Sequence, residues 1–215
     1  MRNNKGFTLM ELLVAVFIAS MVTVALVTIW KAASIQTSQG QRQTMIRNNL
    51  SILMRSLHRD ITEADLVLAP YGAGQSGALI VMARNAHLDS FGSARWVVRP
   101  EVSSLGGTPD DGKYESDPTV IAYCLNGSTV RRTQTPLTES KKDDELVTEL
   151  STACNSGKVY MDYTTSFNVS TSDNINYKVE IIIHKDFAAD AGTANSQTPP
   201  IHIEMENTFT KAGGK

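Results

Sequence analysis

An almost unbroken apolar run near the N-terminus constrains the fold of this chain more than any other feature. Over the nineteen residues from Leu12 to Trp30, the polar side chains are Ser20, Thr23 and Thr28. A helix of this length rises about 28 Å, close to the hydrocarbon core of a bilayer, which is roughly 30 Å thick. The run therefore predicts a single membrane-spanning helix.

The residues before the run predict its orientation, and two alternatives can be weighed against it. Arg2 and Lys5 precede the run, so the positive-inside rule keeps the N-terminus cytoplasmic. A secretory signal peptide has a shorter apolar core, of about 7–15 residues, and a small-residue cleavage site, which the sequence 27–30 does not offer. A plain single-pass anchor leaves Glu11 unexplained, because an ionisable group in lipid is costly and usually has a partner.

The N-terminus resembles the type III signal of type IV pilins and pseudopilins, through the sequence Lys5-Gly6-Phe7-Thr8-Leu9-Met10-Glu11. In that family a prepilin peptidase removes a short basic leader after the glycine, and the new N-terminal residue is N-methylated. The resemblance covers the first 30 residues strongly. It implies cleavage between Gly6 and Phe7, N-methylation of Phe7, and an assembly role for Glu11, which occupies the position of the family's glutamate.

The assembly role of Glu11 also has a physical basis. A carboxylate without a partner in lipid costs on the order of 3 kcal/mol. Cleavage at Gly6 would create an ammonium on Phe7, and this group, on the same or a neighbouring subunit, would compensate the charge. Catalysis is a poor alternative, because no second functional group lies nearby in the sequence.

A second apolar pattern predicts that the helix continues beyond the membrane. Apolar residues recur every three or four positions, as on one face of an amphipathic helix; they are Ile46, Leu50, Leu53, Leu57 and Ile61. We expect a helix from Phe7 to about Leu68, loosened midway at Gly40 and ended by Pro70. The stripe is expected to pack against the sheet that follows.

Short β-like segments follow Gly77 and predict an antiparallel sheet. Strands are expected at 78–82, 94–98, 119–125, 128–132, 158–163, 177–184 and 201–206, and loops at 101–118 and 186–200. Asn126-Gly127 favours a type I′ hairpin turn between two of these strands. The predicted fold class is therefore α+β, with the pilin-like arrangement of a long N-terminal helix packed on an antiparallel sheet.

The predicted organisation has four parts. They are a leader at 1–6, a transmembrane and filament-core helix at 7–30, the amphipathic half of the same helix at 31–68, and a β-rich head at 69–215. The head carries thirteen basic and eighteen acidic residues. This balance argues against broad nucleic-acid binding, which needs a basic face.

Cys124 and Cys154 are the two cysteines of the chain. The region after the membrane run is expected to lie outside the cytoplasm, where two cysteines more often pair than stay free. We therefore predict a disulfide between them. The alternative is a pair of buried, reduced thiols.

No catalytic residue, metal ligand or cofactor is predicted. A loop holds the acidic residues Asp110, Asp111, Glu115 and Asp117, and such a group of oxygen ligands is the kind that calcium prefers. Their spacing does not match the calcium-binding loop of an EF-hand, so a solvated acidic loop is expected. The charged run 141–145 is interpreted as a solvated turn or short helix face. The four histidines, at 58, 87, 184 and 202, are scattered without a metal-ligand spacing or a known catalytic motif.

One further resemblance and one difference bear on the kind of pilin-like protein. The sequence from Gln43 to Leu66 is similar to the J-type minor pseudopilins of type II secretion and the W-type minor pilins of type IV pili. Major pilins commonly carry a Gly and a Pro in the membrane half of the helix, where this chain has Ser20 and Thr28. Both observations favour a minor subunit that helps to initiate or cap a filament.

The implied partners are other pilin or pseudopilin subunits, the prepilin peptidase, an inner-membrane assembly platform and membrane lipid. The implied location is the bacterial inner membrane, with the head in the periplasm, and then a filament tip. One alternative is a major filament subunit or a competence pseudopilin for DNA uptake. An alternative of another class is a membrane-tethered periplasmic enzyme or sensor.

Overall fold

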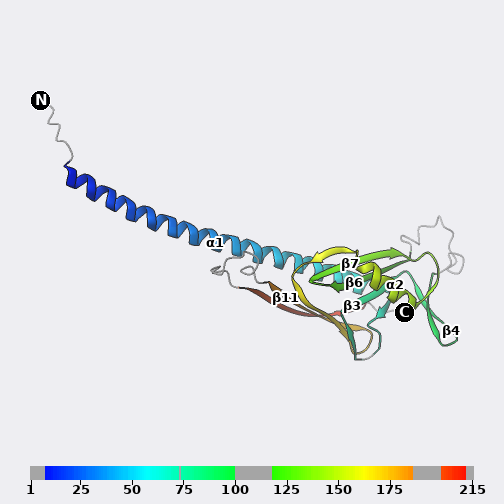
Figure 1. The fold of residues 1–215 in the computed structure, drawn as a ribbon. Coiled ribbons are helices and arrows are strands. Elements are labelled where there is room, and N and C mark those ends of the chain that lie inside the picture. Colours follow the sequence, from blue (N-terminus) through cyan, green and yellow to red (C-terminus); the bar gives the residue numbers. More distant parts are fainter. Residues whose placement is uncertain (1–7, 73, 100–117, 186–199, 212–215) are drawn as a thin grey trace, which may run out of the picture. The chain divides into compact units, whose positions relative to one another are not determined.

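A computed structural model describes residues 8–72, 74–99, 118–185 and 200–211 of the chain. One long helix, α1 (Leu9–Thr62), precedes a set of antiparallel sheets, which confirms the predicted α+β class (Figure 1). The chain divides into two compact units, Met1–Met45 and Ile46–Lys215. The first unit is helical in its described part, and the second contains all of the sheets.

Helix α1 differs from its predicted form at two places. It runs without a break through Gly40, because a helix tolerates an isolated glycine at a cost of about 1 kcal/mol. It ends at Thr62, so the predicted boundary at Leu68 is wrong. Strand β1 (Leu66–Ala69) takes up the following residues and pairs with β3 (Leu79–Arg84), since an apolar segment containing a β-branched valine suits a pleated sheet.

The largest sheet, sheet A, has the strand order β1-β3-β6-β7-β9, with all neighbours antiparallel. Strands β6 (Thr119–Asn126) and β7 (Thr129–Pro136) form the predicted hairpin, and β9 spans Lys158–Met161. The hairpin turn lies one residue later than predicted, because Asn126 pairs with Thr129 and the loop is therefore 127–128. Its first residue, Gly127, has φ +60°, a conformation that glycine adopts without steric cost.

Two smaller sheets complete the second unit. Sheet B has the order β12-β11-β10-β2, with β12 at Ile201–Thr210, β11 at Asn176–Lys185, β10 at Thr164–Thr171 and β2 at Gln75–Gly77. Sheet C has the order β4-β5-β8, with β4 at His87–Phe91, β5 at Ala94–Val98 and β8 at Lys141–Lys142. Helix α2 (Asp143–Cys154) follows β8, so residues 143–145 of the charged run lie on a helix, which was one of the two predicted alternatives.

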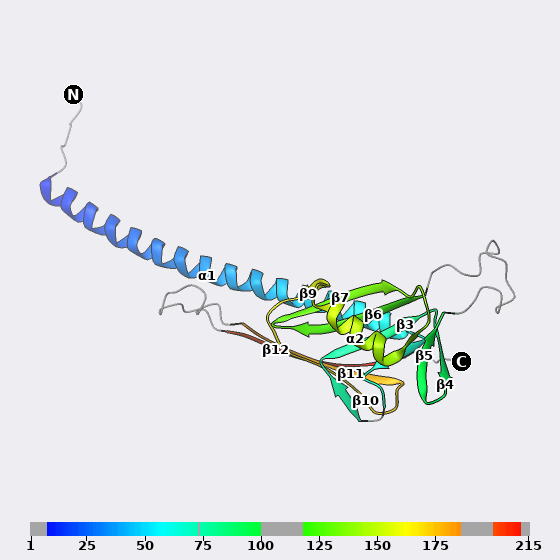
Figure 2. The same cartoon turned by 45° about the vertical axis from the view of Figure 1, so that its right-hand side comes forward.

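Sheet A separates two hydrophobic cores. On one face, the α1 stripe packs against alternate residues of β3 and β6, including Ile80 and Tyr123. On the other face, Val81 and Ala122 pack with Leu146 and Leu150 of α2, and α2 lies over this face in Figure 2. The stripe therefore buries against the sheet as predicted, because side chains along a strand alternate between its two faces.

The predicted disulfide is present. Cys124, two residues before the end of β6, is bonded to Cys154 at the end of α2, across a sequence separation of 30 residues. Both cysteines are buried. The bond ties the C-terminal end of α2 to sheet A and is expected to stabilise the head by restricting the unfolded chain.

Candidate assembly site

The beginning of α1 is closed by a reciprocal capping box formed by Thr8 and Glu11. The Thr8 backbone N–H and hydroxyl donate to Glu11 Oε2 at 2.9 and 3.0 Å. In return, the Glu11 backbone N–H donates to Thr8 Oγ1 at 3.3 Å. This Thr-x-x-Glu arrangement satisfies donors at the helix start that have no partner within the helix. Glu11 therefore has a local structural role as well as its predicted assembly role.

The predicted cleavage and methylation residues, Gly6 and Phe7, lie outside the described residues. The pairing of Glu11 with the Phe7 ammonium accordingly stays a prediction. Both hydrogen bonds from Thr8 end on Oε2 of Glu11. This geometry leaves Oε1 on the same exposed carboxylate to accept from a cationic partner.

The apolar half of α1 presents its side chains outward. From Leu9 to Trp30 every large apolar side chain is at least half exposed, with Val14 the least exposed at 51%. By length and composition the helix can cross a membrane. Such a surface is not stable in water, and it requires either lipid or the apolar helices of other subunits.

The polar side chains of this half are satisfied within the helix itself. The hydroxyl groups of Ser20, Thr23 and Thr28 donate to the carbonyl oxygens of Phe17, Ala19 and Ala25, at 2.7, 2.8 and 2.8 Å. A donor without a partner is costly in hydrocarbon, so these bonds make the three hydroxyls compatible with lipid. The segment consequently matches the membrane span that its sequence predicts.

A buried carboxylate joins the end of α1 to sheet A. The Asp60 side chain is fully buried, and Arg84 of β3 places Nη2 2.6 Å from its Oδ1. Arg132 of β7 places Nε 2.8 Å from its Oδ2, and the hydroxyl of Tyr123 in β6 donates to Oδ2 at 2.6 Å. Arg59 Nε lies 3.3 Å from Oδ1 as well. Since the helix dipole disfavours a carboxylate in the last turn, these four donors account for its presence there.

The charges in this cluster reinforce one another. Burial alone would raise the pKa of Asp60, but the hydrogen bonds from Tyr123 and Arg132, with the charges of Arg132 and Arg84, outweigh it and lower the pKa. Burial and the Asp60 charge raise the pKa of the Tyr123 hydroxyl. Tyr123 therefore stays protonated and remains a hydrogen-bond donor.

Sequence reasoning missed Asp60, although the sequence contained a signal. Asp60 follows Leu57 by three positions and Leu53 by seven, which places it at the border of the buried stripe. A carboxylate on a buried face requires a cationic or hydrogen-bonding partner. The partners Tyr123 and Arg132 lie directly opposite each other in the β6–β7 hairpin, a pairing that the hairpin register determines.

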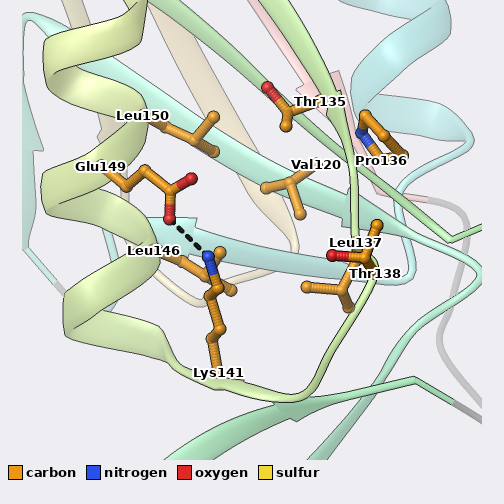
Figure 3. A pocket seen from close by; sticks show the side chains of 9 residues that line it. All are labelled: Val120, Thr135, Pro136, Leu137, Thr138, Lys141, Leu146, Glu149 and Leu150. Carbon is orange, nitrogen blue, oxygen red and sulfur yellow. Dashed lines mark hydrogen bonds and ion pairs between the residues drawn. The ribbon is translucent and has the colours of Figure 1, made fainter.

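A small pocket lies beside α2 and is too small for a metabolite. Figure 3 shows its lining, which consists of Val120, Thr135, Pro136, Leu137, Thr138, Lys141, Leu146, Glu149 and Leu150. Lys141 Nζ and Glu149 Oε2 form an ion pair of 2.9 Å within it. The cavity volume is about 20 Å³, enough for a single water molecule, whereas small-molecule sites measure about 300–1,000 Å³.

The acidic loop and the histidines are the remaining features singled out in the sequence. The acidic loop with Asp110, Asp111, Glu115 and Asp117 lies outside the described residues. Among the described residues, no group of three or more His, Cys, Asp or Glu side chains is arranged to hold a metal ion. The histidines are less scattered than the sequence indicates, because His184 of β11 lies directly opposite His202 of β12.

Comparison with protein families finds a known motif in the N-terminal region. The family model for the prokaryotic N-terminal methylation motif matches residues 1–27. No curated protein and no solved structure gave a significant match to the chain. The matched motif is the type IV pilin signature, and the long apolar helix that follows it fits this signature.

The motif and the fold together define a class of protein. A methylation motif, a membrane-length helix and an antiparallel β head are the parts of a type IV pilin-like or pseudopilin protein. The motif implies processing by a prepilin peptidase and assembly with other pilin subunits. The motif favours a structural subunit over an enzyme. The apolar N-terminal helix fits a single-pass anchor in the inner membrane.

Proposed function

We propose that this chain is a minor pilin or pseudopilin, a structural subunit that helps to initiate or cap a type IV pilus or a type II secretion pseudopilus. The observation that carries the proposal is the methylation motif at the start of a helix whose apolar side chains are exposed and whose hydroxyls are satisfied internally. Such a helix suits two successive environments, first the lipid of the inner membrane and then the helical core of a filament.

The proposed sequence of events begins with the leader. With its N-terminus in the cytoplasm, the chain would be cut after Gly6 by the prepilin peptidase and methylated on Phe7. The head, tied by its disulfide, would lie in the periplasm, where such bonds persist. Assembly would then draw the apolar half of α1 from lipid into contact with neighbouring helices.

Two observations support a minor over a major subunit. Ser20 and Thr28 stand where major pilins commonly carry glycine and proline, and α1 is continuous across both positions. The similarity of the Gln43–Leu66 segment to J-type and W-type minor subunits points the same way. A major subunit or a competence pseudopilin is the second candidate, and a tethered enzyme or sensor is the third.

Glu11 has two proposed roles that can be separated by mutation. It caps its own helix through Thr8, and its negative charge would receive the Phe7 ammonium of a docking subunit. Glu11→Gln keeps an oxygen that can accept the hydrogen bonds of the cap but removes the charge. Glu11→Ala removes both, whereas Thr8→Val keeps the charge and removes the hydroxyl from the cap.

The test measures recruitment of each variant into the native complex. We expect Glu11→Gln and Glu11→Ala to insert and be processed, because removing a charge lowers the cost of burying the segment, but to co-purify poorly with partner pilins. Thr8→Val should co-purify better than either. Normal co-purification of both Glu11 variants would show that charge pairing does not drive assembly.

Copy number in purified filaments tests the assignment as a minor subunit. Quantitative mass spectrometry of native filaments should find this chain at a small fraction of the most abundant pilin. Intact mass should show a chain that begins at Phe7 and carries one added methyl group. A chain present at the level of the main subunit would favour the major-subunit alternative, and a chain that still begins at Met1 would overturn the pilin assignment.

A further inference from the structure

Two of the four histidines of the chain meet on the exposed face of sheet B, although they are eighteen positions apart in the sequence, at 184 and 202. His184 is exposed on β11, and the side chain of His202 on β12 is 54% exposed. Their ring centroids are 5.9 Å apart, with an angle of 62° between the ring planes. Neither side chain contributes to the hydrophobic core or to the assembly site described above.

The backbone register holds these side chains close together. The His184 N–H donates to Tyr163 O on the β10 side, so the hydrogen-bonding groups of His184 face away from β12. Ile175, just before β11 and nine positions before His184, accepts from Lys211 N–H on the β12 side. This agrees with the rule that successive residues of a strand point their N–H and C=O groups to alternate sides. His184 and His202 therefore form a non-hydrogen-bonded antiparallel pair, the type in which opposite side chains lie closest.

The spacing of the rings is that of two imidazoles sharing one ion. A ligating imidazole nitrogen lies about 2.0–2.1 Å from a bound zinc ion, so the centres of two ligating rings lie about 4.5–6 Å apart. The observed 5.9 Å falls within this interval. The described residues contain no preformed group of three ligands, so water would complete the coordination of an ion held here.

Glu204 supplies the second component of such a site. It lies two positions after His202 on the same strand, hence on the same face of the sheet, and its Oε1 is 3.1 Å from His202 Nε2. Metal-binding histidines usually donate their second ring N–H to a carboxylate, a backbone carbonyl or water, which fixes the tautomer and the ring orientation. With Nε2 donating to Glu204, the lone pair of His202 lies on Nδ1.

We propose that His184 and His202 form a surface site for a divalent transition metal of the zinc, copper and nickel class, with Glu204 as a positioning residue. Imidazole suits these ions, whereas calcium and magnesium prefer sites built from oxygen ligands. A bound ion would link β11 to β12, an edge strand of sheet B. The competing interpretation is an edge-to-face pair of rings that stabilises two strands without binding a ligand.

The test uses the mature full-length protein in detergent, purified with a tag that contains no histidine. Zn²⁺ titration by calorimetry should show one ion per chain. Glu204→Ala should weaken binding by about tenfold, as is typical for an outer-shell partner, and His184→Gln or His202→Gln should weaken it further. The matched controls are His87→Gln and Glu206→Ala, which lies on the same face of β12, and both should bind as the wild type does.

Cu²⁺ provides a second measurement that a general loss of stability would not mimic. Electron paramagnetic resonance of the wild-type complex should show two coordinated imidazole nitrogens, and either His184→Gln or His202→Gln should reduce this to one. Circular dichroism in metal-free buffer should show that the variants are folded, because the altered side chains are exposed. Unchanged Zn²⁺ affinity in both histidine variants, or an equal loss in the His87→Gln control, would overturn the proposal.

Discussion

Removal of the Asp60 carboxylate is expected to be among the most damaging single changes in the head. Asp60→Ala leaves the guanidinium group of Arg132, whose side chain is only 13% exposed, without its carboxylate. It leaves Arg84, whose side chain is 20% exposed, with only the exposed carboxylate of Glu63. It also leaves the Tyr123 hydroxyl without its acceptor. Breaking a buried ion pair on one side costs about 3–5 kcal/mol, which corresponds to a fall in Tm of roughly 6–20 °C for a domain of this size.

A graded set of variants separates charge from hydrogen bonding. Asp60→Asn keeps the volume and one acceptor, and it should cost about 1.5–3 kcal/mol, the value of a hydrogen bond to a charged group. Tyr123→Phe removes only the hydroxyl and should cost about 1 kcal/mol. Glu63→Gln is the matched control, because Glu63 also pairs with Arg84, at 2.9 Å, but its side chain is 52% exposed. An exposed pair of this kind contributes about 0–1 kcal/mol.

The assay is urea unfolding of the mature protein in detergent, followed by tryptophan fluorescence and circular dichroism. The free energy of unfolding should fall in the order wild type, Glu63→Gln, Asp60→Asn, Asp60→Ala. If Asp60→Ala loses no more stability than Glu63→Gln, the cluster does not anchor α1 to sheet A, and our interpretation of the buried carboxylate is wrong.

The same cluster predicts how stability depends on pH. The pKa of Asp60 is lower in the folded protein than in the unfolded chain, where it is about 3.9. The stabilising contribution is therefore fully present above this value and is lost as the pH falls through the lower, folded pKa. The difference in unfolding free energy between the wild type and Asp60→Asn should accordingly narrow below about pH 4, and a constant difference would contradict the assignment.

Three further predictions concern processing and the head. Gly6→Val should leave the precursor uncut, because a branched side chain crowds the peptidase, while Met10→Leu should be processed normally; intact mass of membrane fractions would distinguish them, and cleavage of Gly6→Val would argue against the predicted site. The double variant Cys124→Ala with Cys154→Ala should lose up to about 3–4 kcal/mol of stability, the loop-entropy value for about 30 residues, and reduction of the wild type should produce a similar loss in denaturant unfolding. Gly157→Ala should cost about 1–3 kcal/mol, because its Cβ would lie 2.7 Å from the Arg132 backbone oxygen; Gly127→Asn, at a position with φ +60° and open space around the Cβ, should cost much less in the same assay.

Local patterns in the sequence were sufficient to predict much of this protein. The apolar run from Leu12 to Trp30, the signal around Gly6 and the α1 stripe each depend on residues close in the chain. Helix periodicity and membrane length are properties of such short segments. The α+β class and the β6–β7 hairpin were predictable for the same reason, although the hairpin turn was placed one residue early. The disulfide was predictable on other grounds, because the chain has two cysteines and its head was expected outside the cytoplasm.

Other features depended on contacts between distant segments. Strand β10 was missed because Phe167 and Val169 are its only large apolar residues, and the strand gains its stability by pairing with β11 and β2. The end of α1 at Thr62 follows from the pairing of β1 with β3, which competes with helix in the residues after it. Local propensity is a weak guide where tertiary pairing decides between helix and strand.

The sequence by itself determined the membrane helix, the processing motif and the position of Glu11, because each is encoded within a few turns of one segment. Only the tertiary structure placed Asp60 against Arg84 and Arg132, and His184 opposite His202. Those encounters depend on strand register and on how the sheets fold back on α1. A shift of one residue in either pairing would turn the side chains to the opposite face of the sheet and remove the contact.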